Sequence, residues 1–170
     1  YVFDGFSDRY AHKVIATGPG HAIQLSGGRL VVPVWMSTGT GFSGHRPSVV
    51  SSIYSDDNGA TWQGGDILAE RFTNPSETGA VELSDGRVLF NIRNEHREEN
   101  GRRLVAVSPD GATGWSEPVF DEDLLEPVCL GSILRVPGKD VILFANPHTL
   151  DGEHFGQKVH KDRKNLSIKA

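Results

Sequence analysis

The chain has 170 residues, in which 17 lysines and arginines stand against 22 acidic residues, for a formal net charge of −5. No basic stripe is present that could follow a phosphate backbone, so the charge pattern argues against a nucleic-acid-binding protein. The apolar runs are far shorter than the roughly 18 residues of a membrane span, and no targeting segment is visible. The single cysteine, Cys129, excludes an internal disulfide, and its apolar neighbours are typical of a buried, inert thiol.

Short apolar runs separated by turns are spread along the chain. Twenty glycines and nine prolines supply the turns, and long helical periodicity is missing, so the sequence predicts an all-β fold. The Gly28-Arg29 and Gly86-Arg87 steps each precede an apolar run and are typical of hairpin turns. In chain order, the expected strands are residues 22–25, 29–35, 49–54, 80–83, 88–93, 104–108, 132–136, 141–145 and 166–169.

Residues 55–62, Ser-Asp-Asp-Asn-Gly-Ala-Thr-Trp, fit the pattern Ser-x-Asp-x-Gly-x-Thr-Trp at every fixed position. Asp57 can accept hydrogen bonds from backbone amides and Gly59 takes a positive φ without strain, so the pattern predicts a tight turn between two strands. Trp62 is expected to be largely buried and to pin the turn to the apolar interior. The octapeptide is therefore a hairpin staple and not a catalytic site, so function has to come from other residues.

A second, altered copy of this pattern follows. Ser108, Asp110 and Trp115 keep the spacing of Ser55, Asp57 and Trp62 at an offset of 53 residues, while Ala112 and Gly114 replace the glycine and the threonine. A recurrence of roughly 50 residues is the repeat length of a four-stranded propeller blade. The alternative is two ordinary turns in an all-β protein.

The octapeptide resembles the Asp-box of bacterial neuraminidase repeats, which occurs in sialidases and in unrelated secreted β-proteins. Other segments resemble a single family in the same order along the chain, namely residues 18–25, 28–33, 74–77, 81–87, 91–94, 127–132, 144–147 and 163–166. That family is the six-bladed exo-α-sialidases, so the resemblance implies an all-β, six-bladed β-propeller. At roughly 50 residues per blade, residues 1–170 would form a partial propeller domain of about three blades, truncated at both ends.

The resemblance also assigns two arginines to substrate binding. Sialidases bind the carboxylate of sialic acid with three arginines, because a guanidinium grips a carboxylate in a planar, bidentate way that lysine cannot copy. By resemblance, Arg93 is the second of these and Arg163 the third. The structural alternative for Arg93 is a surface ion pair. For Arg163 it is a solvated basic face, together with Lys158, Lys161 and Lys164.

By resemblance, Glu77 is the catalytic carboxylate. In the family the nucleophile is a tyrosine, and a neighbouring carboxylate accepts its proton because a phenol with a pKa near 10 is a poor nucleophile at neutral pH. Glu77 and Arg93 are expected on one rim of the fold, with side-chain ends within about 10 Å, because both must face a single sugar-sized pocket. The alternative for Glu77 is an exposed loop residue. Glu82 alternates with apolar neighbours and is expected to face solvent.

Three catalytic elements of the family have no match in this sequence. They are the first arginine, the aspartate that acts as general acid and base, and the tyrosine nucleophile; Tyr1, Tyr10 and Tyr54 are misplaced for the last role. The 170 residues alone are therefore expected to be unable to hydrolyse a sialoside.

The function implied by the resemblance is that of an exo-α-sialidase, a retaining glycosidase that releases terminal sialic acid from a sialylated glycan through a sialyl-tyrosine intermediate. The seven histidines show no ligand spacing, so the sequence predicts neither a metal site nor a cofactor. The resemblance favours a secreted or periplasmic protein. The alternatives are a non-catalytic propeller that binds sugar or protein, and a related propeller glycosidase that acts on a different acid sugar.

Overall fold

The computed structural model describes residues 3–41, 43–72, 74–95, 101–150, 153–154, 157–158 and 163–170. All regular elements within these ranges are strands: β1 (Val14–Thr17), β2 (Ile23–Gln24), β3 (Leu30–Ser37), β4 (Ser48–Ser55), β5 (Gln63–Gly64), β6 (Thr78–Glu82), β7 (Val88–Ile92), β8 (Arg102–Ser108), β9 (Val119–Leu125), β10 (Ser132–Arg135), β11 (Ile142–Pro147), β12 (Glu153–His154), β13 (Gln157–Lys158) and β14 (Leu166–Lys169). The described ranges contain no helix that is long and apolar enough to cross a membrane. The all-β prediction is confirmed.

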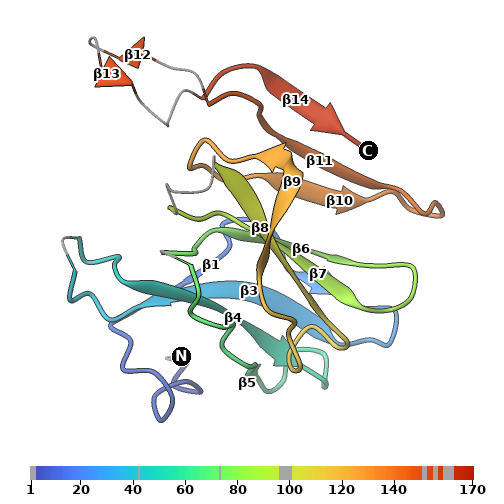
Figure 1. Ribbon diagram of the computed structural model, residues 1–170. Coiled ribbons are helices and arrows are strands. Elements are labelled where there is room, and N and C mark those ends of the chain that lie inside the picture. The colour runs from blue at the N-terminus through green and yellow to red at the C-terminus, as the bar shows by residue number, and fades with distance from the viewer. Residues whose placement is uncertain are drawn as a thin grey trace.

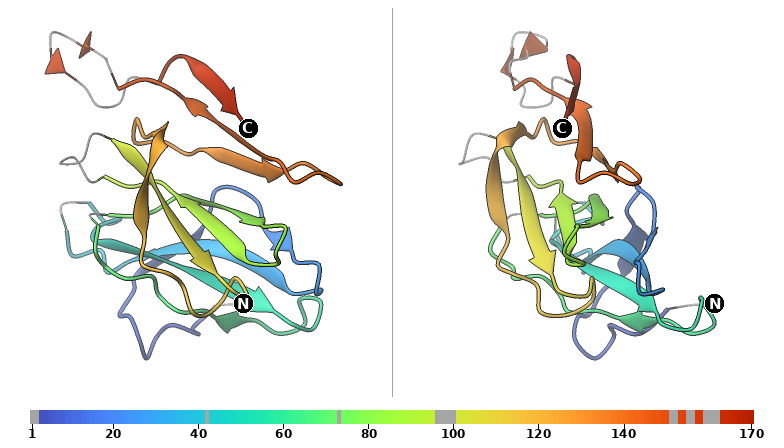
Figure 2. Two further views of the ribbon diagram at one scale, coloured as in Figure 1. Left: turned by 45° about the vertical axis from the view of Figure 1, so that its right-hand side comes forward. Right: turned by 90° about the vertical axis from the view of Figure 1, so that its right-hand side faces the viewer.

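The strands form three antiparallel sheets and one short hairpin. The first sheet has the order β1-β3-β4-β5 with β2 also paired to β3, the second has the order β6-β7-β8-β9, and the third has the order β10-β11-β14. Figure 1 shows these sheets stacked in chain order from bottom to top, with the β12–β13 hairpin at the upper left. The two turned views in Figure 2 keep the first and third sheets at opposite ends of the stack.

Each of the nine strands expected from the sequence is present, with ends shifted by a few residues, but β1, β5, β9 and the β12–β13 hairpin were not expected. β9 was missed because three acidic residues, Asp121 to Asp123, interrupt its apolar pattern. This strand lies at the edge of the second sheet, where charged side chains can reach solvent.

Pro33 explains why β1 and β2 are separate strands. Both pair with β3, β1 as far as Val34 and β2 from Val31, so the break falls opposite Pro33, which has no amide hydrogen to donate. The chain instead bends toward the second sheet, where the Gly18 carbonyl accepts a hydrogen bond from the Thr78 amide at 3.3 Å. The interrupted strand thereby fixes the start of β6.

The octapeptide forms the predicted turn between β4 and β5. The Asp57 carboxylate accepts hydrogen bonds from the Thr61 amide at 2.8 Å and from the Thr61 hydroxyl at 2.6 Å. Trp62 is partly buried, in agreement with the expected burial, but it is not among the residues packed against the apolar clusters of the described ranges. Its indole N–H donates to the Gly59 carbonyl at 3.1 Å, so the ring closes over its own turn and does not enter the core.

The second copy is the same kind of turn, placed between β8 and β9. Asp110 Oδ1 accepts hydrogen bonds from the Ala112 and Thr113 amides at 2.8 and 2.7 Å, and Asp110 Oδ2 accepts one from the Thr113 hydroxyl at 3.0 Å. Thr113 therefore takes the role of Thr61 one position earlier than the sequence comparison placed it. Trp115 packs on Phe90 with ring centroids 4.1 Å apart, so the second tryptophan, and not the first, reaches the core.

Arg29 links the two turns across the sheets. Its Nε donates to Asp56 Oδ1 at 2.7 Å and its Nη1 donates to Asp110 Oδ2 at 3.0 Å. Asp66 adds a second link, because its amide donates to the Ala112 carbonyl at 2.7 Å and its carboxylate accepts from the Gly114 amide at 3.0 Å. The first two sheets are thus joined at the edge that carries both turns.

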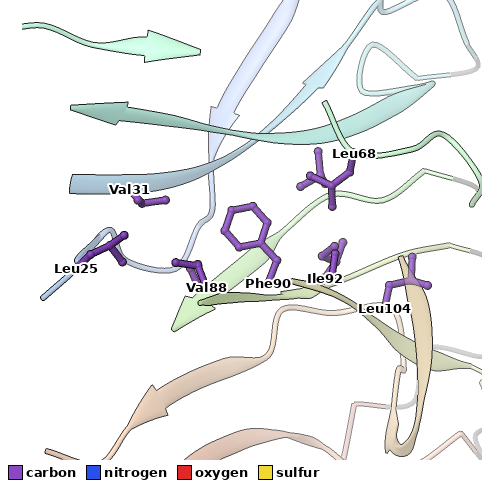
Figure 3. Packing of buried hydrophobic residues seen from close by; sticks show 10 residues of the cluster. Leu25, Val31, Leu68, Val88, Phe90, Ile92 and Leu104 are labelled. Atoms are coloured by element: carbon purple, nitrogen blue, oxygen red, sulfur yellow. The ribbon is translucent and has the colours of Figure 1, made fainter. Parts of the chain in front are cut away.

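The largest apolar cluster fills the space between the first and second sheets, and Figure 3 shows seven of its labelled members pointing toward one another: Leu25, Val31, Leu68, Val88, Phe90, Ile92 and Leu104. Full burial of such a side chain contributes about 1.5–3 kcal/mol. A smaller cluster of Val81, Ile133 and Phe144 lies between the second and third sheets. The second sheet is therefore covered on both faces, which explains its near-continuous apolar strands.

Candidate active site

The hairpin register of β6 and β7 brings Glu77 and Arg93 together. The turn from Leu83 to Arg87 aligns the strands so that Thr78 pairs with Ile92. Glu77 immediately precedes β6 and Arg93 immediately follows β7, so they are the next opposed pair, and the Arg93 amide donates to the Glu77 carbonyl at 2.9 Å. A pairing this regular follows directly from the position of the turn.

The side chains of this pair form an ion pair, with Arg93 Nη1 2.8 Å from Glu77 Oε2. The expectation that the two side-chain ends lie within about 10 Å on one rim is therefore confirmed by their contact. The side chains keep 15% and 25% of their surface exposed, so both remain accessible from solvent. Arg93 Nε is buried without a hydrogen-bond partner, which leaves the guanidinium with unused donor capacity.

Two further charged residues, which the sequence analysis did not find, extend this pair. Glu95 Oε1 lies 3.7 Å from Arg93 Nη2, and Arg46 grips Glu95 with two donors, its Nε at 3.0 Å from Oε2 and its Nη2 on Oε1. Asn74 Nδ2 donates to Glu95 Oε2 at 3.4 Å. Glu95 could have been suspected because it lies two residues beyond Arg93 on the same rim, but Arg46 comes from a loop 49 residues away and carries no local signal.

The third predicted residue, Arg163, lies exposed just before β14. Its Nη2 donates to the Val128 carbonyl at 2.8 Å. Of the basic cluster that was its structural alternative, Lys161 lies outside the described residues, and the side chain of Lys158 is not described.

Cys129 carries a buried thiol whose pKa is raised. Burial raises its pKa first and the Glu126 carboxylate raises it further, while the charges of Arg163, Arg103 and Arg93 act in the opposite direction. The structure brings Glu77 and Arg93 into direct contact, whereas Arg163 contacts the Val128 carbonyl. The raised pKa keeps the thiol protonated, in agreement with the expected inert cysteine.

Tyr10, Tyr54 and Glu82 have structural contacts elsewhere, and Tyr1 lies outside the described residues. Tyr54 packs in the first sheet, with the Arg29 guanidinium 4.5 Å from its ring centroid, and Tyr10 packs against the cluster around Phe6. Glu82 is partly exposed, and its carboxylate also accepts hydrogen bonds from the Ser26 amide at 2.9 Å and the Ser26 hydroxyl at 2.7 Å. It joins the first and second sheets, and only their packing makes Ser26 its neighbour.

A cleft of about 960 Å³ opens between the second and third sheets, but none of Glu77, Arg93 and Arg163 lines it. Within the part of the chain that the structure describes, no three His, Cys, Asp or Glu side chains are grouped so as to hold a metal ion.

One Asp-box turn follows β4 in the first sheet and another follows β8 in the second sheet. This repetition is typical of proteins built from neuraminidase-type repeats. The model of the BNR repeat-like domain family matches residues 7–170. A sialidase of Bacteroides fragilis is 31% identical over 144 residues, which cover 81% of this chain and 24% of that protein. The chain belongs to the BNR repeat-like family, and sialidases are among its curated relatives.

Solved structures agree with the sequence comparison. The structure of a Hadza microbial sialidase superposes with a TM-score of 0.70 at 27% identity, over 93% of this chain and 28% of that one. Trypanosoma rangeli sialidase in complex with sialic acid superposes with a TM-score of 0.57 at 27% identity, over 80% of this chain and 21% of that one. The chain spans between 12% and 34% of the length of four curated sialidases, including the Bacteroides protein.

Proposed function

We propose that these 170 residues contribute the second and third carboxylate-binding arginines and the catalytic glutamate of a six-bladed exo-α-sialidase, in which they form about three blades. The observation that carries the proposal is the accessible Glu77–Arg93 ion pair at the end of β6 and β7, with a 2.8 Å contact. Family membership supports the reaction class, and the sialic acid complex of a structural neighbour supports the substrate class.

Arg93 would bind the substrate carboxylate through the N–H donors of its accessible guanidinium. Its Nη1 is engaged by Glu77 and its Nη2 lies 3.7 Å from Glu95 Oε1, but 15% of the side chain remains exposed. A guanidinium has five N–H donors in a fixed plane, so it can hold Glu77 and a second carboxylate at the same time. Arg163, whose Nη2 donates to the Val128 carbonyl, would supply a further planar contact.

Glu77 would accept the proton of a tyrosine nucleophile supplied by a part of the propeller outside these residues. A neutral phenol avoids the repulsion that a carboxylate nucleophile would meet from the substrate's own carboxylate. The contact with Arg93 holds the Glu77 carboxylate in one orientation, which general base catalysis requires. Attack by the phenolate on the anomeric carbon would break the glycosidic bond, with the leaving alcohol protonated by the aspartate acid, and give a sialyl-tyrosine intermediate. Water activated by the same aspartate would then displace the tyrosine and release sialic acid with retention.

The test is kinetic and uses a full-length protein that contains this segment. Arg93→Lys replaces a bidentate contact with a point charge and should lower kcat/KM for an aryl sialoside by about 10- to 100-fold. Glu77→Gln should lower mainly kcat, because it removes proton acceptance and leaves binding largely intact.

The exposed ion pair of Arg71 and Glu117 supplies matched controls, since Arg71→Lys and Glu117→Gln make the same chemical changes in side chains that are 61% and 75% exposed. Both control variants should keep the parent kinetics. A silent Arg93→Lys, or a Glu77→Gln that raises only KM, would favour a sugar-binding module over an enzyme.

A further inference from the structure

A fully buried ion pair lies behind the candidate active site. Arg103 in β8 and Glu126, directly after β9, have side-chain exposures of 0% and 1%, and Arg103 Nη1 donates to Glu126 Oε2. Burial lowers the pKa of Arg103 and raises that of Glu126, and each partner opposes the shift of the other. Because desolvation of two charges is expensive, apolar residues of similar volume are often as stabilising as such a pair. A contribution to folding stability alone therefore does not explain why this buried ion pair is present.

The contacts of the pair lead to both substrate arginines. On one side, Arg103 Nε donates to Asn91 Oδ1 at 2.7 Å, and Asn91 lies in β7 two residues before Arg93. On the other side, Arg103 Nη1 donates to the Cys129 carbonyl at 2.8 Å, while Glu126 Oε1 accepts from the Cys129 amide at 2.8 Å. One buried guanidinium thus ties the strand that carries Arg93 to the turn of residues 126–129.

The turn of residues 126–129 holds Val128 in a left-handed conformation with a φ of 55°. A positive φ is unfavourable for a β-branched residue and persists only where the surrounding contacts enforce it. Here both backbone polar groups of the next residue, Cys129, are held by the buried pair. The conformation directs the Val128 carbonyl to Arg163 Nη2, at 2.8 Å.

We propose that Arg103 and Glu126 are positioning residues that fix Arg163, relative to Arg93, for carboxylate binding. The buried pair sets the Glu126–Cys129 turn, the turn presents the Val128 carbonyl, and that carbonyl holds the Arg163 guanidinium. The proposal rests on the proposed function, since it assigns a purpose to the placement of both arginines.

The test replaces both charges at once, with Arg103→Met and Glu126→Leu, in a full-length protein that contains this segment. The apolar pair avoids an uncompensated buried charge, so the melting temperature should stay near that of the parent. Affinity for an unreactive sialic acid analogue that keeps the carboxylate should fall about tenfold, the equivalent of one charge-assisted hydrogen bond. A control, Arg29→Met with Asp56→Leu, removes the ion pairs of Arg29 with Asp56 and with Asp110, away from Arg93 and Arg163, and should leave the affinity unchanged.

A double-mutant cycle separates positioning from general destabilisation. In an Arg163→Ala background the Arg103→Met, Glu126→Leu change should cost less than about twofold in affinity, because the contact through which it acts is already gone. An equal loss in both backgrounds would overturn the proposal. If the Arg103→Met, Glu126→Leu variant does not fold, Arg103→Lys takes its place. Lysine keeps the buried positive charge but loses the planar guanidinium that donates to both Asn91 and Cys129. Its effect on affinity should likewise disappear in the Arg163→Ala background.

Crystal structures of the variants provide a readout that does not depend on activity. The contact between Arg163 Nη2 and the Val128 carbonyl should be lost in the apolar double variant, and its retention at 2.8 Å would refute the positioning role. If the parent protein neither cleaves sialosides nor binds the analogue, the proposed function fails, while the structures still decide whether the pair positions Arg163.

Discussion

At the scale of single residues, the two Asp-box carboxylates show how local hydrogen bonds tune a charge. The Thr61 hydroxyl and amide, together with the Ser55 hydroxyl, lower the pKa of Asp57 to about 2. Burial opposes the same change at Asp110, but hydrogen bonds from Thr113 and Ala112 outweigh it and also lower the pKa to about 2. Both turns therefore depend on an ionised aspartate.

This dependence predicts a specific loss of stability in acid. The pKa of Asp110 is about 2 in the folded protein, below the value of roughly 3.9 in the unfolded chain. The ionised carboxylate therefore stabilises the folded state fully above the unfolded-state pKa. This stabilisation is lost as the pH falls through the folded-state pKa. Asp110→Asn should lower the free energy of unfolding at pH 7 and flatten its fall between pH 4 and pH 2. Urea unfolding across this range measures the effect. As a control, Asp140→Asn at an exposed turn position should give the same dependence of unfolding free energy on pH as the parent protein. If the curve of Asp110→Asn ran parallel to that of the parent, Asp110 would not be the source of the acid sensitivity.

At the scale of elements, the β6–β7 hairpin is the unit that builds the Glu77–Arg93 pair. Its turn needs Gly86, whose φ is 84°. Because side chains alternate between the two faces of a strand, a slip of one residue would turn every side chain of one strand to the opposite face and separate the pair.

Gly86→Ala tests this turn without steric complication. A Cβ added at Gly86 meets no atom within 4 Å, and the same holds at Gly27, which does not have a positive φ. Gly86→Ala should therefore cost about 1–2 kcal/mol in unfolding free energy, whereas Gly27→Ala should be neutral or slightly stabilising. Equal effects of the two changes in urea unfolding would show that φ is not the cause.

At the scale of the whole molecule, β6 lies centrally. It packs against β3 of the first sheet and β10 of the third, so the strand that begins beside Glu77 is held from both sides. The last strand of the third sheet, β14, is less well packed, since its Leu166 and Ile168 are 76% and 71% exposed. Rigid support is therefore concentrated where the candidate site begins.

The 170-residue chain, purified alone, should not hydrolyse an activated aryl sialoside. By resemblance, the tyrosine nucleophile, the aspartate acid/base and one arginine have no counterpart in it, and general acid/base catalysis alone commonly contributes about 10² to 10⁴ in rate. Release of the chromophore would be followed against a buffer blank, with an active sialidase as the positive control. Turnover above the blank would refute the account of which residues are missing.

The sequence by itself determined the features that depend on neighbours along the chain. The Asp-box turns, the hairpin turns at Gly28 and Gly86, and the opposition of Glu77 and Arg93 follow from local hydrogen bonds, positive-φ glycines and the two-residue period of strands. Even in the altered second turn the aspartate, Asp110, accepts hydrogen bonds from the backbone amides that follow it, although the expected position of the threonine was wrong by one residue.

Only the tertiary structure decided the contacts between residues that are distant in sequence. The grip of Arg46 on Glu95, the buried pair of Arg103 and Glu126, and the bond of Glu82 to Ser26 span 49, 23 and 56 residues respectively. The packing of Trp115, and not Trp62, against the largest apolar cluster also depends on which sheet packs against each turn. Such contacts arise when whole sheets stack, and the free energy of that stacking comes from apolar burial, which is non-directional and does not reveal which polar groups it will bring together.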